Sequence, residues 1–158
     1  MNEKIKNAKQ LFANNINCAQ STLAVHASDY GMSKELAFKL ASAMGGGMGH
    51  QGKTCGAVIG AYMVLGLEFG NQIPDDIESK LILRKASNLF VEKFNKRHGS
   101  IDCPLLLKKD FRIAGELEEI QETGLTKKLC PEFIQSSIEI IQEVKEELRN
   151  MRINSSKA

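Results

Sequence analysis

The sequence has 158 residues, about the length of one ordinary domain. Its 42% hydrophobic and 25% charged residues are typical of a globular protein and exclude a disordered tail or a fibrous repeat. Lys and Arg number 21 against 19 Asp and Glu, so the net charge is only +2. That balance lacks the electrostatic footprint of a nucleic-acid-binding or lipid-binding protein.

Helical periodicity recurs along the chain, and strand-forming residues are scarce. The N-terminal third predicts helices over residues 3–13 and 18–30, with Gly31 ending the second. Ser33 is placed to cap a third helix. The predicted apolar face of that helix consists of Leu36, Leu40 and Ala43.

A glycine-rich loop over residues 45–52 leads into a fourth helix over residues 53–69, which is apolar nearly all round. Such a helix is expected to be enclosed by others. The sequence therefore predicts a compact, all-α, multi-helix bundle built around residues 53–69.

The C-terminal half predicts a long helix that starts at Pro74 and ends at His98, because proline favours the first helical turn. Short helices are expected after Cys103 and around Glu116. A last long helix is expected to start near Pro131.

The domain organisation predicted is one all-helical, four-cysteine domain over residues 1–150 and a frayed tail over residues 151–158. The most apolar run, residues 56–67, is shorter than the roughly 20 residues that a membrane span needs. No secretory signal is visible at the N-terminus. We therefore expect a cytoplasmic protein that does not insert into membranes.

The cysteines carry the chemistry of this sequence, and none of them forms a C-x-x-C pair. Each is expected at a helix N-terminus, where free N–H groups and the helix dipole stabilise a thiolate and lower the thiol pKa. Lysines 53, 127 and 128 would add positive charge nearby. The alternative is that they are small buried hydrophobic residues. The four positions are Cys18, Cys55, Cys103 and Cys130.

Gly56 follows Cys55 directly and lies one turn before Gly60. Small residues at this spacing let neighbouring helices approach the backbone closely. A bare glycine would also leave space around the Cys55 sulfur for a cluster, a partner thiol or a substrate. Gly56 is therefore included among the candidate cofactor-binding residues.

The chain resembles the C_GCAxxG_C_C (CGAxxG) family of redox-active proteins. The resemblance covers residues 8 to 145 and rests on the order and spacing of the four cysteines and on neighbouring segments. It implies an all-helical cytoplasmic prokaryotic protein in which the four cysteines form the site, with redox activity. A related region in split-Soret-type cytochromes favours an iron–sulfur role. The matching segments are Asn17-Cys18-Ala19-Gln20-Ser21, residues 45–49, Cys55 to Gly60, and Gly99 to Cys103, with Cys130 at the end.

Residues Gly47 to Thr54 match the P-loop pattern G-x-x-x-x-G-K-[ST] letter for letter. A P-loop requires a strand before it, whereas a helix is expected here. Nucleotide binding is therefore the least favoured hypothesis, and Thr54 is expected to cap the helix. His50 in this loop has three interpretations: a ligand, a proton donor or an exposed residue. His98 is interpreted as a helix C-cap, and His26 as a surface or core residue.

Two functional hypotheses remain open on the sequence. In the first, the four cysteines are redox-active thiols that either ligate an iron–sulfur cluster or form dithiol/disulfide couples. In the second, they hold a structural zinc ion. The first implies an unidentified redox partner or small-molecule oxidant. The sequence gives no reason to expect a nucleic-acid partner and is compatible with a homo-oligomer.

Overall fold

The structure, a computed structural model, describes residues 1–155, and these contain helices with one isolated β-bridge but no strand. The prediction of an all-α multi-helix bundle is confirmed. No described helix is both long enough and apolar enough to cross a membrane. The elements in chain order are α1 (Asn2–Ala13), α2 (Cys18–Ala24), η1 (Ala27–Tyr30), α3 (Lys34–Ala41), η2 (Ser42–Met44), α4 (Gly45–Met48), α5 (Gly56–Phe69), α6 (Ile77–His98), α7 (Cys103–Leu107), α8 (Ala114–Thr123) and α9 (Leu125–Ser155).

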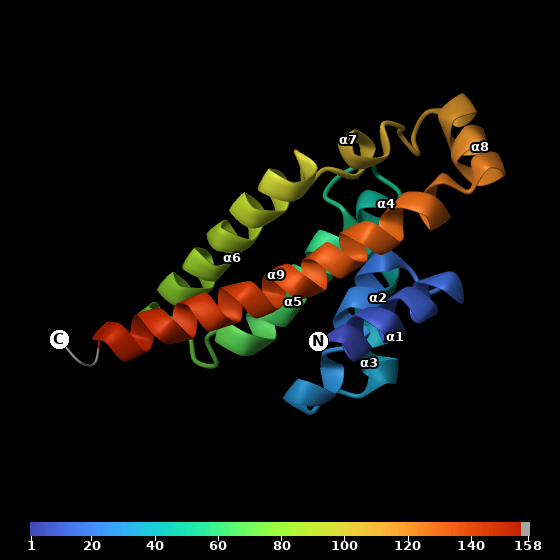
Figure 1. Ribbon diagram of the computed structural model, residues 1–158. Helices are drawn as coiled ribbons and strands as arrows, with labels where there is room; N and C mark the ends of the chain where they lie inside the picture. The colour runs from blue at the N-terminus through green and yellow to red at the C-terminus, as the bar shows by residue number, and fades with distance from the viewer. Residues whose placement is uncertain (156–158) are drawn as a thin grey trace.

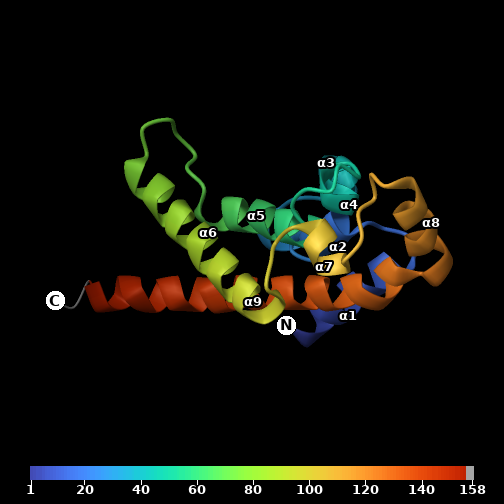
Figure 2. The same ribbon diagram turned by 90° about the horizontal axis from the view of Figure 1, so that it is seen from above.

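Helix α5 is the central helix, as its apolar sequence predicts, and it packs against α2, α6 and α9. Helix α5 approaches α2 closely at Gly60, which has no side chain. A Cβ atom at this position would lie only 2.8 Å from the carbonyl oxygen of Ala19. The long helix α9 runs across the molecule, with α1–α3 on one side and α6 on the other (Figure 1). Seen from above, α4 and α7 gather beside the first turns of α9, next to α8 (Figure 2).

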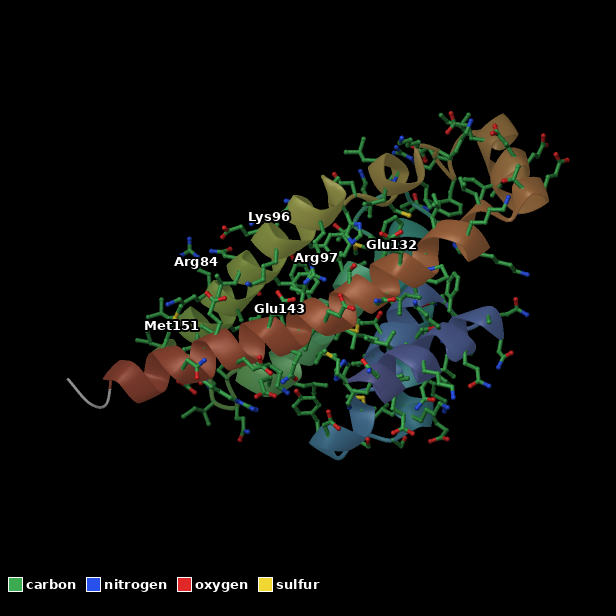
Figure 3. All side chains as sticks on the ribbon, viewed as in Figure 1. Arg84, Lys96, Arg97, Glu132, Glu143 and Met151 are labelled. Carbon is green, nitrogen blue, oxygen red and sulfur yellow. The ribbon has the colours of Figure 1, made fainter. Side chains whose placement is uncertain are left out.

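The α6–α9 contact is apolar inside and ionic outside. Phe90 and Phe94 of α6 are fully buried. At the surface, Arg97 forms ion pairs with Glu139 and Glu143 of α9, and Figure 3 shows Arg97 and Glu143 on facing sides of the two helices. Exposed ion pairs of this kind each contribute less than about 1 kcal/mol, so the aromatic packing dominates the contact.

Several predicted boundaries in the N-terminal half are wrong. The second helix ends at Ala24, and residues 27–30 form a separate 3₁₀ turn.

The predicted apolar face of the third helix points outward: Leu36 and Leu40 are exposed, while Ala37 and Ala41 are fully buried. The side of α3 that packs against α2 is therefore the one that carries these alanines.

The later helices also start at other residues than predicted. Helix α6 begins at Ile77, because the side chain of Asp76 accepts a hydrogen bond from the N–H of Ser79 and caps it there. Helix α9 begins at Leu125, so Pro131 lies inside it rather than at its start. This helix continues to Ser155, so residues 151–155 are helical where a frayed tail was expected. The rest of that predicted tail, residues 156–158, lies outside the described residues.

Candidate functional site

The four cysteines come from four different elements. Cys18 is the first residue of α2, Cys55 is the N-cap of α5, and Cys103 is the first residue of α7. The expected position at a helix N-terminus is thus confirmed for these three. It is wrong for Cys130, which lies in the second turn of α9 because that helix starts at Leu125.

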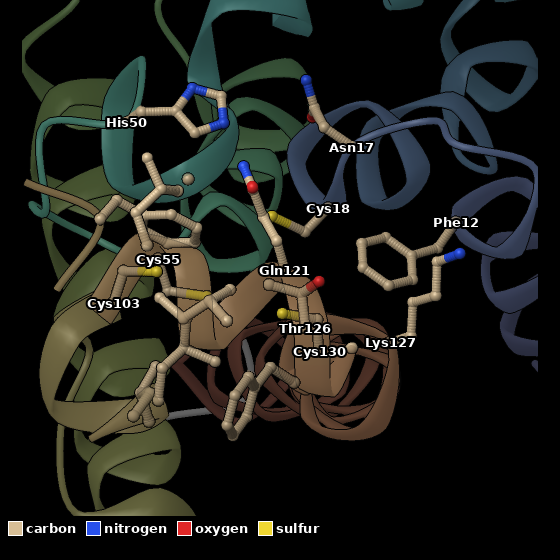
Figure 4. A pocket seen from close by; sticks show the side chains of 18 residues that line it. Phe12, Asn17, Cys18, His50, Cys55, Cys103, Gln121, Thr126, Lys127 and Cys130 are labelled. Atoms are coloured by element: carbon tan, nitrogen blue, oxygen red, sulfur yellow. The ribbon is translucent and has the colours of Figure 1, made fainter. Parts of the chain in front are cut away.

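All four side chains line one pocket, which is called the thiol pocket below and has a volume of about 400 Å³. Figure 4 shows the sulfur atoms of the labelled cysteines directed into the same space. Each cysteine is more than nine-tenths buried, and each is a free thiol. Residues up to 112 apart in the sequence, Cys18 and Cys130, therefore meet at a single place.

A short backbone ladder holds Cys55 and Cys103 together. The N–H of Cys55 donates to the carbonyl of Ile101 at 2.8 Å, and the N–H of Cys103 donates to the carbonyl of Lys53 at 2.9 Å. These bonds flank the antiparallel bridge between Thr54 and Asp102. In this register the two cysteines are diagonal neighbours on the same face of the ladder, about 7–8 Å apart between Cα atoms.

Cys18 is held by the start of α2. The side chain of Asn17 accepts a hydrogen bond from the N–H of Gln20, and the Gln20 side chain accepts one from the N–H of Asn17, forming a capping box. The Asn17 amide also donates to the carbonyl of Ser42 at 2.9 Å, which ties α2 to η2. The first turn of α2 is thus fixed from both sides.

Gly56 leaves space for the sulfur of Cys18, which lies on the neighbouring helix α2. A Cβ atom at position 56 would lie 2.5 Å from the Sγ atom of Cys18. The helix start of α5 can therefore approach the Cys18 sulfur only because residue 56 has no side chain.

The glycine-rich segment brings backbone close to the thiols. Gly46 and Gly47 have φ values of +61° and +70°, the left-handed region that favours glycine. A Cβ atom at Gly47 would lie 2.9 Å from the Cβ of Cys103 and 2.8 Å from the backbone of Lys53. The segment thus fits between the ladder and the pocket with no room for side chains.

Electrostatics reverse the prediction that the thiol pKa values are lowered. Burial raises the pKa of all four cysteines, to about 12 for Cys103. Mutual repulsion adds to this, because ionisation of Cys18 raises the pKa of the other three. Backbone hydrogen bonds from Gly46, Ala19 and Ala57 act in the opposite direction on Cys18, but its pKa still lies above the ordinary value. The helix N-termini therefore reduce the effect of burial without overcoming it.

Sequence analysis missed the apolar wall of the thiol pocket. The side chains that form it come from α1, α7, α8, α9 and the loop before α8. No motif marks them, because each looks like an ordinary core position in its own segment. They are Phe12, Leu106, Leu107, Phe111, Leu117, Ile120 and Phe133.

Of the three histidines, only His50 lines the thiol pocket. Its backbone has a φ of +62°, and its ring meets that of Phe111 edge-on at 5.5 Å. A Cβ at Gly46 would lie 2.5 Å from the His50 ring, so the ring packs on bare backbone. His98 lies at the end of α6, as predicted, but Gly99 rather than His98 is the C-cap, and the His98 ring packs against Phe94 and Phe133.

His26 is a buried residue beside Asp29, away from the thiol pocket. Burial lowers its pKa to about 4, with Lys4 and Lys145 acting in the same direction. Its Nε2 atom is buried and has no hydrogen-bond partner among the described residues. Of the two interpretations given for it, the core residue is the one observed.

The P-loop pattern does not form a P-loop. Helical turns precede it, and the N–H groups of Lys53 and Cys55 donate to the carbonyls of Gly47 and Ile101. Thr54 belongs to the bridge, and Cys55 rather than Thr54 is the N-cap of α5. The backbone that would cradle phosphates is therefore already used to position cysteines.

Within residues 1–155, no three His, Cys, Asp or Glu side chains are grouped closely enough to bind a single metal ion. A tetrahedral zinc site would need its sulfurs about 2.3 Å from one ion.

Comparison with known proteins gives one match. Residues 16–144 match the family described as "Putative redox-active protein (C_GCAxxG_C_C)", which covers most of the chain and all four cysteines. No curated protein and no solved structure matches the chain.

Proposed function

We propose, from the premise that this chain belongs to the C_GCAxxG_C_C family of redox-active proteins, that its four cysteines hold an iron–sulfur cluster in the thiol pocket. When bound, the cluster would supply one-electron transfer. The observation that carries the proposal is the convergence of four buried thiols, from four separate elements, on one pocket. The electron partner is either a second protein or a small-molecule oxidant.

The protonation of the thiols supports a metal-containing group. Burial and mutual repulsion keep the four cysteines protonated, so they would form a cluster of neutral thiols near pH 7. Buried thiolates become favourable only when paired with positive charge, and a metal cation deprotonates its thiol ligand outright. A site with this composition fits iron better than it fits free thiolates.

The backbone around Cys18 also supports this proposal. N–H groups of Gly46, Ala19 and Ala57 are directed at its sulfur. Hydrogen bonds to ligand sulfurs are one of the means by which proteins set the potential of iron–sulfur clusters. In this chain the donors come from a left-handed glycine and from two helix starts, which hold them rigidly.

The spacing of Cys55 and Cys103 favours a cluster over a disulfide. Diagonal neighbours in an antiparallel pair lie about 7–8 Å apart, whereas a disulfide cannot join Cα atoms more than about 7 Å apart without backbone movement. A cluster distributes its ligands over two or more iron atoms, so it needs no such approach.

A dithiol/disulfide couple remains the second candidate, because the ladder holds Cys55 and Cys103 on one face. It would require thiolates that form near neutral pH, since the optimum attacking thiol has a pKa near ambient. The raised pKa values of all four cysteines oppose this.

The test is anaerobic purification followed by visible spectroscopy before and after dithionite, with iron, sulfide and zinc measured on the same sample. We expect a brown protein that contains iron and sulfide and bleaches on reduction. Cys55→Ser should lose most of the iron. Leu105→Ser, at an exposed position on α7 two residues beyond Cys103, should keep it.

A wild-type protein that takes up neither iron nor sulfide, even after anaerobic reconstitution, would contradict the proposal. Stoichiometric zinc in that sample would then support the structural zinc site. A metal-free sample in which Cys55 and Cys103 oxidise reversibly would instead support the dithiol couple.

A further inference from the structure

We propose that the part of the thiol pocket bounded by α8 binds a small aromatic carbonyl compound, a class that includes the quinones. This inference deepens the proposed function, since it names the class of small molecule that binds beside the redox site. It rests on the shape, lining and charge of the part of the pocket that contributes no cysteine.

Helix α8 contributes to the pocket but not to the cysteine set. Ile120 is its only buried residue, and both Ile120 and Leu117 line the pocket. The apolar side of α8 therefore packs largely onto the pocket, while Glu118, on the other side, is exposed. A pocket walled in this way has apolar surface that a ligand would cover.

The lining of the thiol pocket includes aromatic rings. Rings of Phe12, Phe111 and Phe133 line it from three different elements. Aromatic rings stack or meet edge-on with a contribution of about 0.5–1.5 kcal/mol per pair beyond the apolar area they bury. Three such rings around one space favour a flat aromatic ligand over a flexible aliphatic one.

Three polar side chains at the pocket are able to donate hydrogen bonds to a ligand, those of Gln121, Thr126 and Lys127. None of these side chains has a hydrogen-bond partner within the part of the chain that the structure describes. Figure 4 shows the Gln121 amide directed toward the rim where His50 and Asn17 lie. The Asn17 amide already donates to the carbonyl of Ser42.

The charge of the pocket matches this donor set. The residues that line it include one lysine and one histidine, and no Asp or Glu. A ligand with accepting oxygens, such as an aromatic carbonyl, is therefore complementary, whereas an amine or other cation is not. The lining thus selects an apolar ring system with carbonyl oxygen at its edge.

The dimensions are suitable for such a ligand. The whole thiol pocket, including the side lined by the cysteines, has a volume of about 400 Å³, within the range of about 300–1,000 Å³ typical of small-molecule sites. These sites are mostly apolar with a few placed polar groups, as this one is. Figure 4 shows the Gln121 side chain of α8 among the four labelled cysteines, so a ligand against α8 would lie next to them.

The test uses anthraquinone-2-sulfonate, an aromatic carbonyl compound that does not add to thiols, titrated calorimetrically into the purified protein. We expect saturable 1:1 binding. Leu117→Trp should fill the pocket and weaken binding at least about tenfold, which corresponds to about 1.4 kcal/mol. Glu118→Trp, one residue along α8 at an exposed position, should bind as the wild type does.

Gln121→Leu provides a second variant at an exposed position in case Leu117→Trp does not fold, and it should weaken binding about threefold to tenfold through loss of one hydrogen bond. Absence of saturable binding to the wild type, or equal binding by wild type and both pocket variants, would overturn the inference. Iron is measured on the same samples. Iron without binding contradicts only this inference, while binding without iron contradicts only the iron–sulfur proposal.

Discussion

The Cys18 sulfur lies against the backbone of Gly56, so that a Cβ atom at residue 56 would be 2.5 Å from Sγ. Helices α2 and α5 each begin at this point, and each brings N–H groups to the same sulfur. The contact explains why the chain has glycine directly after Cys55. It also makes residue 56 a sensitive probe of the thiol pocket.

Gly56→Ala should displace Cys18 or shift α5, because the nearest atoms also include the carbonyl oxygen of Met44 at 2.9 Å. Overpacking of this kind typically costs about 1–3 kcal/mol of unfolding free energy. Gly66→Ala on the same helix is the control, since a Cβ there meets nothing within 4 Å and alanine should stabilise the helix by up to about 1 kcal/mol. Urea unfolding measures both, and equal stability of the two variants would contradict the interpretation.

Gly47→Ala should disrupt the ladder that holds Cys103. Gly47 and Gly49 have φ values of +70° and +63°, so alanine is strained at both. Only at Gly47 would the new Cβ lie 2.8 Å from the Lys53 backbone, whereas at Gly49 the nearest atom is 3.4 Å away. We therefore expect Gly47→Ala to be less stable than Gly49→Ala by more than about 1 kcal/mol and to hold less iron. Similar unfolding midpoints would show that the ladder tolerates the shift.

In the reduced, metal-free protein the thiols should react slowly with iodoacetamide. The pKa of Cys103 is raised to about 12, so its thiolate fraction at pH 8 should be more than about a hundredfold below that of an unfolded thiol. Mass spectrometry of native and guanidinium-unfolded samples measures the ratio for each cysteine. A native cysteine that reacts as fast as its unfolded counterpart would favour the dithiol couple.

The same shifts make the metal-free protein less stable in alkali. Because folding raises the pKa of Cys103, the stabilisation is complete below the ordinary thiol pKa near 9. It is lost as the pH rises from about 9 toward 12, since the unfolded thiols ionise first. Chemical unfolding at pH 8 and pH 10 should show this loss, and Cys103→Ser should reduce it. A stability that rises over this interval would contradict the assignment.

Acid should act through His26. Its pKa is lowered to about 4, so its contribution to stability is complete above the ordinary histidine pKa near 6.5. Below that pH the unfolded state binds the proton first, and stability is lost at up to about 1.4 kcal/mol per pH unit until about pH 4. The free energy of unfolding of His26→Gln should vary less between pH 7 and pH 5 than that of the wild type. A dependence in His26→Gln as steep as that of the wild type would contradict this assignment.

Lys127 should raise the reduction potential of a cluster in the thiol pocket. It is the only lysine that lines the pocket, and a positive charge favours the reduced, more negative state. An interaction on the order of 1 kcal/mol, or about 40 mV, is expected for a partly exposed charge at this range. Lys127→Ala should lower the potential by about that amount at low salt. Lys128→Ala, at the adjacent exposed position, should change it less; equal shifts would contradict a specific role for Lys127.

The fold class and the central helix were predictable because apolar residues recur with helical period and because residues 56–69 have almost no polar side. Helix boundaries were less predictable. Helix α3 buries Ala37 and Ala41, so Leu36 and Leu40 are exposed although their spacing looks like that of a buried face. Pro131 marked a helix start by the usual preference, but Gly124 ends α8 and the next helix begins immediately after it.

Only some of the residues that line the thiol pocket could be predicted from the sequence. Cysteines stand out in a sequence, and their neighbours Asn17 and Gly56 carry signals of capping and close approach. Phe12, Leu117 and Ile120 have no comparable signal, because only the tertiary fold brings α1 and α8 to the same pocket. The sign of the thiol pKa shift was wrong for the same reason, since burial depends on the whole fold and local helix starts do not reveal it.

The cysteines lie between residues 18 and 130, so the pocket closes only when α1, α2, α5, α7 and α9 are all in place. Any group bound by all four therefore binds the complete fold and not a partly folded chain. Binding of that kind shifts the folding equilibrium of the entire domain by mass action. A proteolytic cut between α6 and α7 would place Cys18 and Cys55 on one fragment and Cys103 and Cys130 on the other, so neither fragment alone could hold a group that all four cysteines bind.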